Sequence, residues 1–497
     1  MKEEAMKRIK AWQDEIKAYQ LALTTMSYDR LTVAPENGID YYSEQAAYLS
    51  GVLYSIQTDP DIEKTLNELK SEELNAEQKR MIELHLKDFD RLKRIPKDDY
   101  VAYQKLCQVS EKKWEEAKIK KDYSIFEPYL LQVIAAQKKF CALRDATKEP
   151  YDILLDDYEE GMDQKKYDAF FALIKEKLLP LIHEITLKQD ALRTDFLEGS
   201  WDIEKQKQMM KVLQKYLNFD PSWGYMGISA HPFTSCFSHN DVRITNAYHE
   251  NMLLSSIFSL IHETGHAIYE HQIPEAYEGT VLCNVSMGIH ESQSRMYENN
   301  LGRRMSFWNR NYDELVSLWP DRLKDIDQET FVRAVNSAKH SLIRTEADEL
   351  TYPVHILIRY EIEKGIFDGS VDCRRLEETW NQKMKEYLGI TVPDTSQGIL
   401  QDVHWSDGSF GYFPTYALGS AYAAQFINAM QKDIDIDTAL AYQDMASIQK
   451  WQKERIHCYG ASIPSLQIIE NATGESFNPQ YYIEYLYNKY RDLYQIK

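Results

Sequence analysis

The sequence lacks most features of secreted, membrane-bound and multi-module proteins. Its six cysteines are scattered and include no Cys-x-x-Cys pair, which argues against a disulfide framework. No run of 18 apolar residues occurs, and the first ten residues lack the apolar core of a signal peptide. We therefore expect a cytoplasmic protein with reduced thiols.

Glycine and proline are also scarce, at 19 and 15 of 497 residues, and no Ser/Gly-rich or Pro-rich linker divides the chain. Apolar residues recur mainly at helical spacing. Asn75, with Gln78 three residues later, is typical of a capped helix start, and Pro96 interrupts the apolar pattern that follows. These patterns predict one mostly α-helical domain over residues 1–497.

Basic residues are outnumbered by acidic ones, 58 to 78. The formal net charge is −20, and the sequence contains no evident basic patch that would attract a phosphate backbone or an anionic membrane surface. We expect neither nucleic acid nor membrane among the partners.

What the sequence does contain is one His-Glu-x-x-His array, at His262, Glu263 and His266. Apolar residues at three- and four-residue spacing beside it predict a helix, on which the two histidines project from one face and can share a Zn²⁺ ion. Glu263 is then close to the metal, as a base acting on metal-activated water should be. Gly265 weakens a helix by about 1 kcal/mol, so we expect another backbone or the substrate to approach closely there.

A third metal ligand is available in Glu291, 25 residues after His266, on a second expected helix. Two histidines and one carboxylate leave an open position for water, as catalytic zinc sites require. His290 is interpreted as a neighbour of the site or a core residue, because a fourth ligand would close that position.

Alternating residues and glycines between Ser222 and Tyr248 predict a short β-hairpin or meander just before the metal-binding helix. An edge strand there could hold an extended peptide by main-chain hydrogen bonds, and an ordinary buried hairpin has the same pattern.

Further polar groups lie among apolar residues downstream. Arg359 follows His355 by four residues, so both project from one helix face, and Arg344 precedes them. A buried arginine needs an anion, which is either an internal carboxylate such as Glu361 or Asp348 or the carboxylate of a substrate.

Six motifs, in this order, identify a family resemblance. They are His231-Pro-Phe233, Asp241-Val-Arg243-Ile-Thr245, the His-Glu-x-x-His array, His290-Glu-Ser-Gln293, Ile343-Arg-Thr-Glu-Ala-Asp-Glu-Leu-Thr-Tyr-Pro-Val-His355 and Gly398-Ile-Leu-Gln-Asp-Val-His-Trp405. The chain resembles the carboxypeptidase Taq family of metallocarboxypeptidases over almost its whole length. One departure is Tyr28-Asp29, where such proteins usually carry Trp-Asp.

The resemblance implies a nearly all-α fold with a small sheet near the metal and a deep cleft, as in neurolysin-like metallopeptidases. It also implies that N-terminal helices, roughly residues 1–120, cover the cleft as a lid, and that the protein is a homodimer. The implied activity is release of single amino acids from peptides with free C-termini, with broad specificity. The implied metal ligands are His262, His266 and Glu291, holding one Zn²⁺ per chain or alternatively Co²⁺, and Glu263 is the implied general base.

The remaining roles follow from side-chain chemistry. Tyr416, Tyr412 and His404 are candidates to stabilise the oxyanion formed when water adds to the peptide carbonyl. Arg359 is the expected contact for the substrate carboxylate, and the expected helpers are Arg344, Arg243, His231 and His355. Asp348 is the expected partner of a ligand histidine.

Two other functions share parts of this pattern. A metallo-endopeptidase or oligopeptidase would carry the same three ligands and base. A non-catalytic peptide-binding protein, with a metal that only joins two helices, would not need Glu263.

Overall fold

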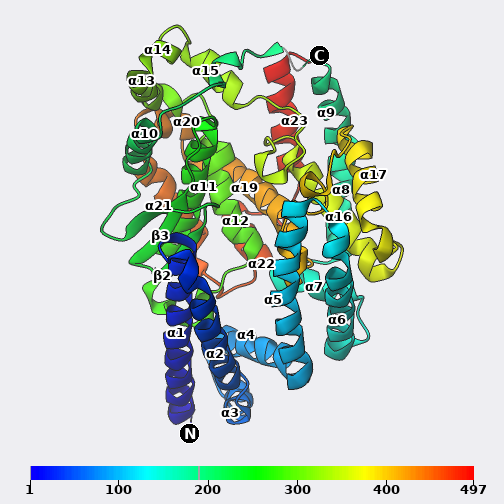
Figure 1. Cartoon of the computed structure of the whole chain (residues 1–497). Helices are drawn as coiled ribbons and strands as arrows, with labels where there is room; N and C mark the ends of the chain where they lie inside the picture. The colour runs from blue at the N-terminus through cyan, green and yellow to red at the C-terminus, as the bar shows by residue number, and fades with distance from the viewer. Residues whose placement is uncertain (1, 189–190, 497) are drawn as a thin grey trace.

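The computed structural model describes residues 2–188 and 191–496. Helices hold 71% of the chain, and the one sheet formed by the described residues has three strands, which confirms the predicted mostly helical fold with a small sheet (Figure 1). Within the described residues, no helix combines the length and the apolar character needed to cross a membrane.

Before the sheet, the regular elements of the described residues are all helices. The helices are α1 (Lys2–Thr32), α2 (Ile39–Gln57), α3 (Pro60–Lys70), α4 (Ala76–Lys93), α5 (Lys97–Lys120), α6 (Glu127–Asp145), α7 (Pro150–Tyr158), α8 (Gln164–Leu173), α9 (Leu179–Thr186) and α10 (Ile203–Tyr216).

The helices after the sheet carry most of the candidate site residues. They are α11 (Leu253–Gln272), α12 (Met287–Arg295), α13 (Trp308–Leu318), α14 (Pro320–Leu323), α15 (Gln328–Val335), α16 (Tyr352–Asp368), α17 (Leu376–Leu388), α18 (His404–Asp407), α19 (Phe413–Asp433), α20 (Ile436–Ala441), α21 (Met445–Arg455), α22 (Ser465–Thr473) and α23 (Gln480–Tyr494). A π-helical turn, Met296–Leu301, continues α12.

Local signals in the sequence set several helix boundaries. The side chain of Asn75 accepts a hydrogen bond from the backbone N–H of Gln78, whose own side chain accepts from the backbone of Asn75, which confirms the predicted capped start of α4. Pro96 separates α4 from α5, as predicted.

The N-terminal helices have a small core of their own. Side chains from α1, α3 and α4, among them Ile9, Trp12, Leu66 and Ile82, pack into a cluster that is separate from the main core. In Figure 1 these helices project from one side of the body. A separate core gives this region the internal stability that a lid would need.

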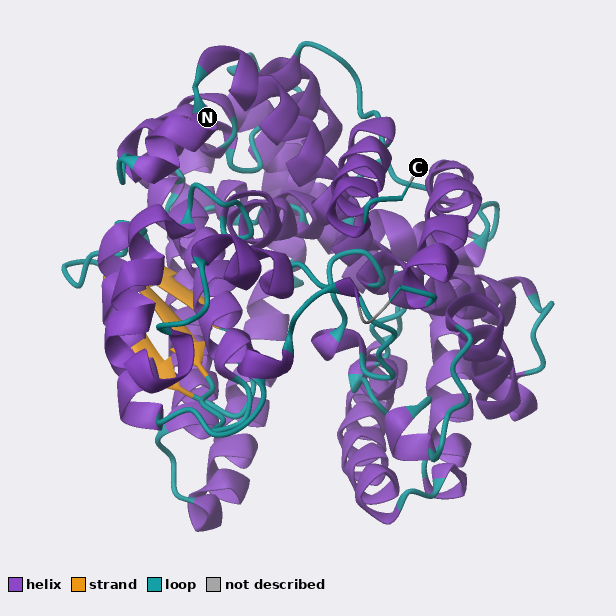
Figure 2. Ribbon diagram, turned by 90° about the horizontal axis from the view of Figure 1, so that it is seen from above, coloured by secondary structure: helices purple, strands orange, loops and turns teal. Residues whose placement is uncertain are grey.

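The sheet consists of β1 (Gly224–Ile228), β2 (Thr234–Ser238) and β3 (Asp241–Asn246), in the order β1-β3-β2. β2 and β3 form the antiparallel hairpin predicted for this segment, and β1 adds to β3 in parallel rather than continuing a meander. Figure 2 shows the three strands together on one side of the molecule, among helices. Tyr28 of α1 packs against this sheet, with its ring centroid 5.9 Å from that of Phe233 and 5.8 Å from that of Phe237.

Two glycines let α11 and α19 pack closely against α12. A Cβ atom at Gly265 of α11 would lie 2.6 Å from the carbonyl oxygen of Gln293, and one at Gly419 of α19 would lie 2.7 Å from the side chain of Glu291. The expectation that Gly265 permits close approach of another backbone is confirmed, and that backbone is α12. The close approach sets Glu291 opposite the histidines of α11.

A Gly265→Ala substitution should therefore destabilise the protein. The added methyl group meets rigid backbone, and overpacking of this kind costs about 1–3 kcal/mol, more than the roughly 1 kcal/mol that alanine gains in a helix. We expect a lower midpoint of thermal unfolding, measured by circular dichroism.

Gly51 of α2 is the matched control, because a Cβ atom there would meet nothing within 4 Å. Gly51→Ala should leave the midpoint unchanged or raise it. Equal midpoints for the two variants would contradict the close contact between α11 and α12.

Candidate metal centre and active site

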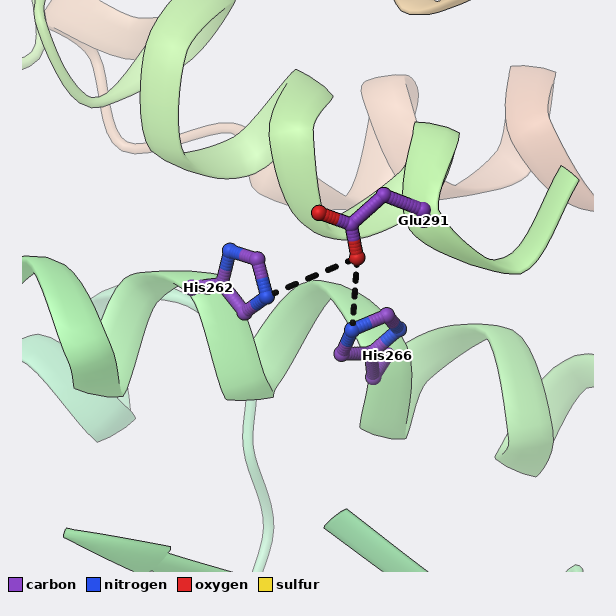
Figure 3. A group of neighbouring side chains, drawn as sticks. All are labelled: His262, His266 and Glu291. Atoms are coloured by element: carbon purple, nitrogen blue, oxygen red, sulfur yellow. Dashed lines mark ion pairs between the residues drawn. The ribbon is translucent and has the colours of Figure 1, made fainter. Parts of the chain in front are cut away.

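Three side chains that could bind a metal converge from two helices. His262 and His266 project from successive turns of α11, and Glu291 faces them from α12 (Figure 3). Oε2 of Glu291 lies 3.8 Å from Nε2 of His262 and 3.4 Å from Nε2 of His266.

This donor set fits a catalytic divalent metal ion. All three ligand atoms lie within 4.8 Å of one another. In a tetrahedral site with metal–ligand bonds of about 2.0–2.1 Å, ligand atoms lie roughly 3.3 Å apart, close to the distances observed. Three protein ligands leave one position open for water or substrate.

Neighbouring groups orient two of these ligands. Nδ1 of His262 lies 2.8 Å from a carboxylate oxygen of Glu298, which sits on the π-helical turn after α12 and leaves Nε2 directed at the triad. Arg295 donates to Oε1 of Glu291 at 2.6 Å and to Glu298 at 3.0 Å. The second oxygen of Glu291 is thereby left to the histidines.

The expectation that Asp348 supports a ligand histidine is wrong. Its carboxylate accepts hydrogen bonds from the hydroxyl of Thr351 and from backbone N–H groups, including that of Lys339, so it organises the loop before α16. Glu298 has the expected role instead. The sequence contains a signal for this role, because Glu298 follows Glu291 and Arg295 at helical spacing and all three fall on one side of a helix.

The ionisation states of His266 and Glu291 suit metal binding, whereas at His262 a metal would compete with a proton. Burial lowers the pKa of His266 to about 3, which keeps this imidazole neutral with a free lone pair. Burial opposes ionisation of Glu291, but Arg295 and then His262 outweigh it and hold the pKa of this carboxyl well below its usual range. Burial also lowers the pKa of His262, and the carboxylates of Glu291 and Glu298 more than reverse this effect.

Glu263 lies on α11 between the two histidines and is held by the sheet. The hydroxyl of Thr234, the first residue of β2, donates to Oε2 of Glu263 at 2.6 Å. Burial raises the pKa of Glu263, which makes this carboxylate a stronger base than an exposed one.

His290 is a neighbour of the triad rather than a member of it. Its ring stacks on that of His266, with centroids 4.4 Å apart, and its Nε2 lies 2.8 Å from Oε1 of Glu270. This position agrees with the interpretation of His290 as a neighbour of the site and not a fourth ligand.

The three candidate oxyanion donors form one aromatic group. The Tyr412 and Tyr416 ring centroids lie 5.0 Å apart, and Nε2 of His404 lies 3.4 Å from the hydroxyl of Tyr416. Burial raises the pKa of Tyr416 well above its usual value and lowers that of His404 to about 4. The Tyr416 hydroxyl therefore keeps its proton and can donate it in a hydrogen bond.

Contrary to the expectation from the sequence, Arg359 is not in a position to contact the carboxylate of a substrate. Its side chain has no exposed surface, and its Nε donates to Asp402 at 2.8 Å while another N–H donates to Gln401, also at 2.8 Å. The anion that Arg359 binds is therefore an internal carboxylate, but it is Asp402 and neither Glu361 nor Asp348. A substrate carboxylate cannot reach a guanidinium enclosed in this way.

Arg344 lies closer to the site. It shares Asp402 with Arg359, donates to the hydroxyl of Tyr352 at 3.0 Å and lies over the Tyr416 ring, 5.0 Å from its centroid. Arg344 is 6% exposed, the same fraction as Glu263. His355 is fully buried, and burial, followed by the charges of Arg359 and Arg344, lowers its pKa to about 3.

Arg243 and His231 belong to the sheet side. Arg243 of β3 pairs with Asp241 at 2.7 Å and lies over the Phe237 ring, 4.0 Å from its centroid. His231 is exposed in the loop between β1 and β2. The structure therefore brings Arg344, Tyr412, Tyr416 and His404 together and leaves the sheet residues as a separate group.

Comparison with known proteins finds metallocarboxypeptidases that are similar to this chain over almost its whole length. The family described as "Carboxypeptidase Taq (M32) metallopeptidase" matches residues 8–490. "Carboxypeptidase 1" of Bacillus subtilis is 43% identical over 483 residues, covering 96% of each chain, and "Thermostable carboxypeptidase 1" of Thermus thermophilus is 34% identical with the same coverage. The crystal structure of the M32 carboxypeptidase from Deinococcus radiodurans superposes with a TM-score of 0.95 at 30% identity, over 99% of this chain and 100% of that one.

Removing the charge of Glu298 should weaken metal binding without removing a ligand. In Glu298→Gln the group that orients His262 loses its charge, and changes of this kind lower metal affinity by about 10–100-fold. Competition with a chromogenic chelator measures the effect.

The exposed Glu314 of α13 provides the control. Glu314→Gln should bind metal as the unchanged protein does. An unaltered affinity in Glu298→Gln, with the fold intact by circular dichroism, would show that Glu298 does not support the metal ligand.

Proposed function

The chain belongs to the carboxypeptidase Taq (M32) family of metallopeptidases and is a metallocarboxypeptidase, and we propose how its own residues release the C-terminal amino acid of a peptide. The observation that supports the proposal is the triad of the half-buried His262 and His266 and the buried Glu291, with Glu263 beside it. The whole chain, residues 1–497, is proposed to act as one catalytic domain.

The triad is proposed to hold one Zn²⁺ ion, with Co²⁺ as a possible substitute. Two imidazoles and one carboxylate are the ligands of many catalytic zinc sites. A divalent metal bound there would supply a Lewis acid that polarises the scissile carbonyl and activates a water molecule.

Glu263 is proposed as the general base. It would accept a proton from the attacking water at its carboxylate and later return that proton to the leaving amine. The hydrogen bond from Thr234 engages Oε2 of Glu263 and fixes the direction of the carboxylate. The Tyr416 hydroxyl, supported by Tyr412 and His404, would donate to the oxyanion.

We propose that Arg344, rather than Arg359, contacts the carboxylate of the substrate. Arg344 lies over the Tyr416 ring and keeps a small exposed fraction, whereas Arg359 has none and holds Asp402. An enclosed guanidinium of this kind orients its neighbours. Arg243 and His231 are proposed to line the site from the sheet side, with His355 as a support for Arg344.

The N-terminal helices are proposed to cover the site as a lid, because α1 carries part of a separate small core and packs on the sheet through Tyr28. A homodimer and a cytoplasmic location are further proposals. Free cysteines with raised thiol pKa values, such as Cys236 and Cys283, suit a reducing compartment.

Glu263→Gln should abolish hydrolysis while metal binding persists. A glutamine keeps the volume but cannot accept the proton, and loss of a general base costs about 10²–10⁴-fold in rate. We expect kcat to fall by that amount on an acylated dipeptide. Metal content is measured in parallel by mass spectrometry with an inductively coupled plasma.

Hydrolysis by Glu263→Gln at the original rate would show that another group accepts the proton of the attacking water. An unchanged kcat together with a full metal content is the result that decides against the proposed base.

A free C-terminus should be required for cleavage. A peptide and its C-terminally amidated twin differ only in the charge that Arg344 is proposed to bind. We expect the acid to lose residues one at a time from its C-terminus, seen as a ladder in mass spectra, and the amide to resist. Equal cleavage of the two peptides, or cleavage at internal bonds, would indicate an endopeptidase.

A further inference from the structure

A buried carboxylate, that of Glu159, lies between two helices of the active site. Glu159 directly follows α7 and has no exposed surface. Burial raises its pKa to about 7, so the surroundings oppose its charge. Stability alone does not explain a carboxylate in such a place, since an apolar side chain of similar volume often serves as well.

The two oxygens of Glu159 bind one helix each. Oε2 accepts a hydrogen bond of 2.8 Å from the backbone N–H of Gly288, in the first turn of α12, and Oε1 accepts one of 3.2 Å from the hydroxyl of Tyr422 on α19. α12 carries the metal ligand Glu291, and α19 carries Tyr416, the proposed oxyanion donor. One carboxylate therefore joins the helix of the metal ligand to the helix of the oxyanion donor.

The contact with α12 is close enough to fix the start of that helix. A Cβ atom at Gly288 would lie 2.6 Å from Oε2 of Glu159 and 3.0 Å from the ring of Tyr422, so only glycine leaves room for the carboxylate. The N–H group that Glu159 binds is one of those that a helix leaves unpaired in its first turn, where the helix dipole also favours a negative charge. α12 can therefore neither slide nor turn without breaking this contact.

The turn that carries Glu159 is itself held by its charged neighbours. Asp157 accepts two hydrogen bonds from Arg144 of α6, each of 2.6 Å, and Glu160 accepts one of 3.2 Å from Arg80 of α4. A group that positions others must be fixed by contacts of its own. These ion pairs supply such contacts on both sides of Glu159.

We infer that Glu159 is a positioning residue, which fixes the metal ligand Glu291 relative to Tyr416. The rate depends on this arrangement, because a displacement of about 1 Å at the reacting groups can cost on the order of 100-fold. Glu159 acts through α12 and α19 and takes no part in the chemistry itself. The inference rests on the proposed function and adds a supporting residue to it.

Glu159→Met removes both hydrogen-bond acceptors and keeps a side chain of similar size. Release of α12 lets Glu291 shift, so metal affinity should fall about tenfold, as is usual when a group that supports a metal ligand is lost. At saturating zinc, kcat on an acylated dipeptide should fall about 100-fold with KM little changed. Metal affinity is measured by competition between zinc and a chromogenic chelator, which does not depend on hydrolysis.

Two further variants separate the two hydrogen bonds. In Glu159→Gln the amide oxygen still accepts from Gly288 and the amide N–H group can donate to the Tyr422 hydroxyl, so metal affinity and kcat should return to within about threefold of the unchanged protein. Tyr422→Phe releases α19 alone, so metal affinity should persist while kcat falls about tenfold. Its matched control is Tyr490→Phe, at a buried tyrosine whose hydroxyl has no hydrogen-bond partner among the described residues, and this variant should behave as the unchanged protein.

Glu363→Met controls for a general loss of stability. Glu363 is buried to the same extent as Glu159, and burial likewise raises its pKa to about 7. It binds the backbone N–H of Gly411 and not α12. Glu363→Met should therefore bind zinc with the affinity of the unchanged protein.

The inference is overturned by any of four results. These are an unaltered metal affinity in folded Glu159→Met, an equal loss of affinity in Glu363→Met, a Glu159→Gln variant as impaired as Glu159→Met, or an unaltered kcat in Tyr422→Phe. Should Glu159→Met fail to fold, Gly288→Ala displaces the carboxylate from the other side, and an unaltered affinity there decides against the inference in the same way. Absence of C-terminal release from the unchanged protein would instead reject the proposed function.

Discussion

The site depends on keeping one buried carboxylate ionised. Glu291 is 6% exposed, and burial of this kind opposes its charge unless cations and donors surround it. Arg295 supplies the main compensation by binding one oxygen of Glu291, and its second contact with Glu298 ties the carboxylate to His262. Without this network the carboxylate would be protonated or turned away, and the histidines of α11 would have no third partner. The close packing of α12 against Gly265 and Gly419 has a function only because this charge is stabilised at the contact.

A second network supports the opposite side of the site. α16 holds the segment that carries His404 and Tyr412 at two points one turn apart. Arg359 binds Asp402 and Gln401, and the fully buried Glu363 accepts from the indole of Trp405 at 2.7 Å and from the backbone of Gly411 at 2.7 Å. Groups that touch substrate must be held rigidly by others that do not. A buried arginine next to a site is therefore weak evidence of substrate contact until its anion is known.

These networks explain what the sequence could and could not reveal. The triad was predictable because His262 and His266 are fixed by helical spacing and Glu291 is one motif away. Glu298 and Arg295 obey the same spacing, and their role was missed because charged residues at i, i+3 and i+4 also occur on ordinary solvated helices. The partner of Arg359 could not be predicted, since Asp402 lies 43 residues away and only the tertiary fold brings the two together. The parallel pairing of β1 with β3 was missed for the same reason, because strand direction depends on the connection and not on alternation.

The two sides of the metal site differ in the chemistry by which they can recognise a peptide. On one side Arg344, Tyr416 and His404 are fixed by Asp402 and by aromatic packing, so they offer charge and hydrogen-bond donors at defined positions. On the other side β2, an edge strand among the described residues, offers backbone groups. Fixed charges distinguish a terminal carboxylate from a continuing chain, because leaving such groups unmatched in a buried site is costly. Backbone pairing is indifferent to side-chain identity. Under the proposed roles, an enzyme built in this way would select strictly for the end of a peptide and only loosely for its sequence.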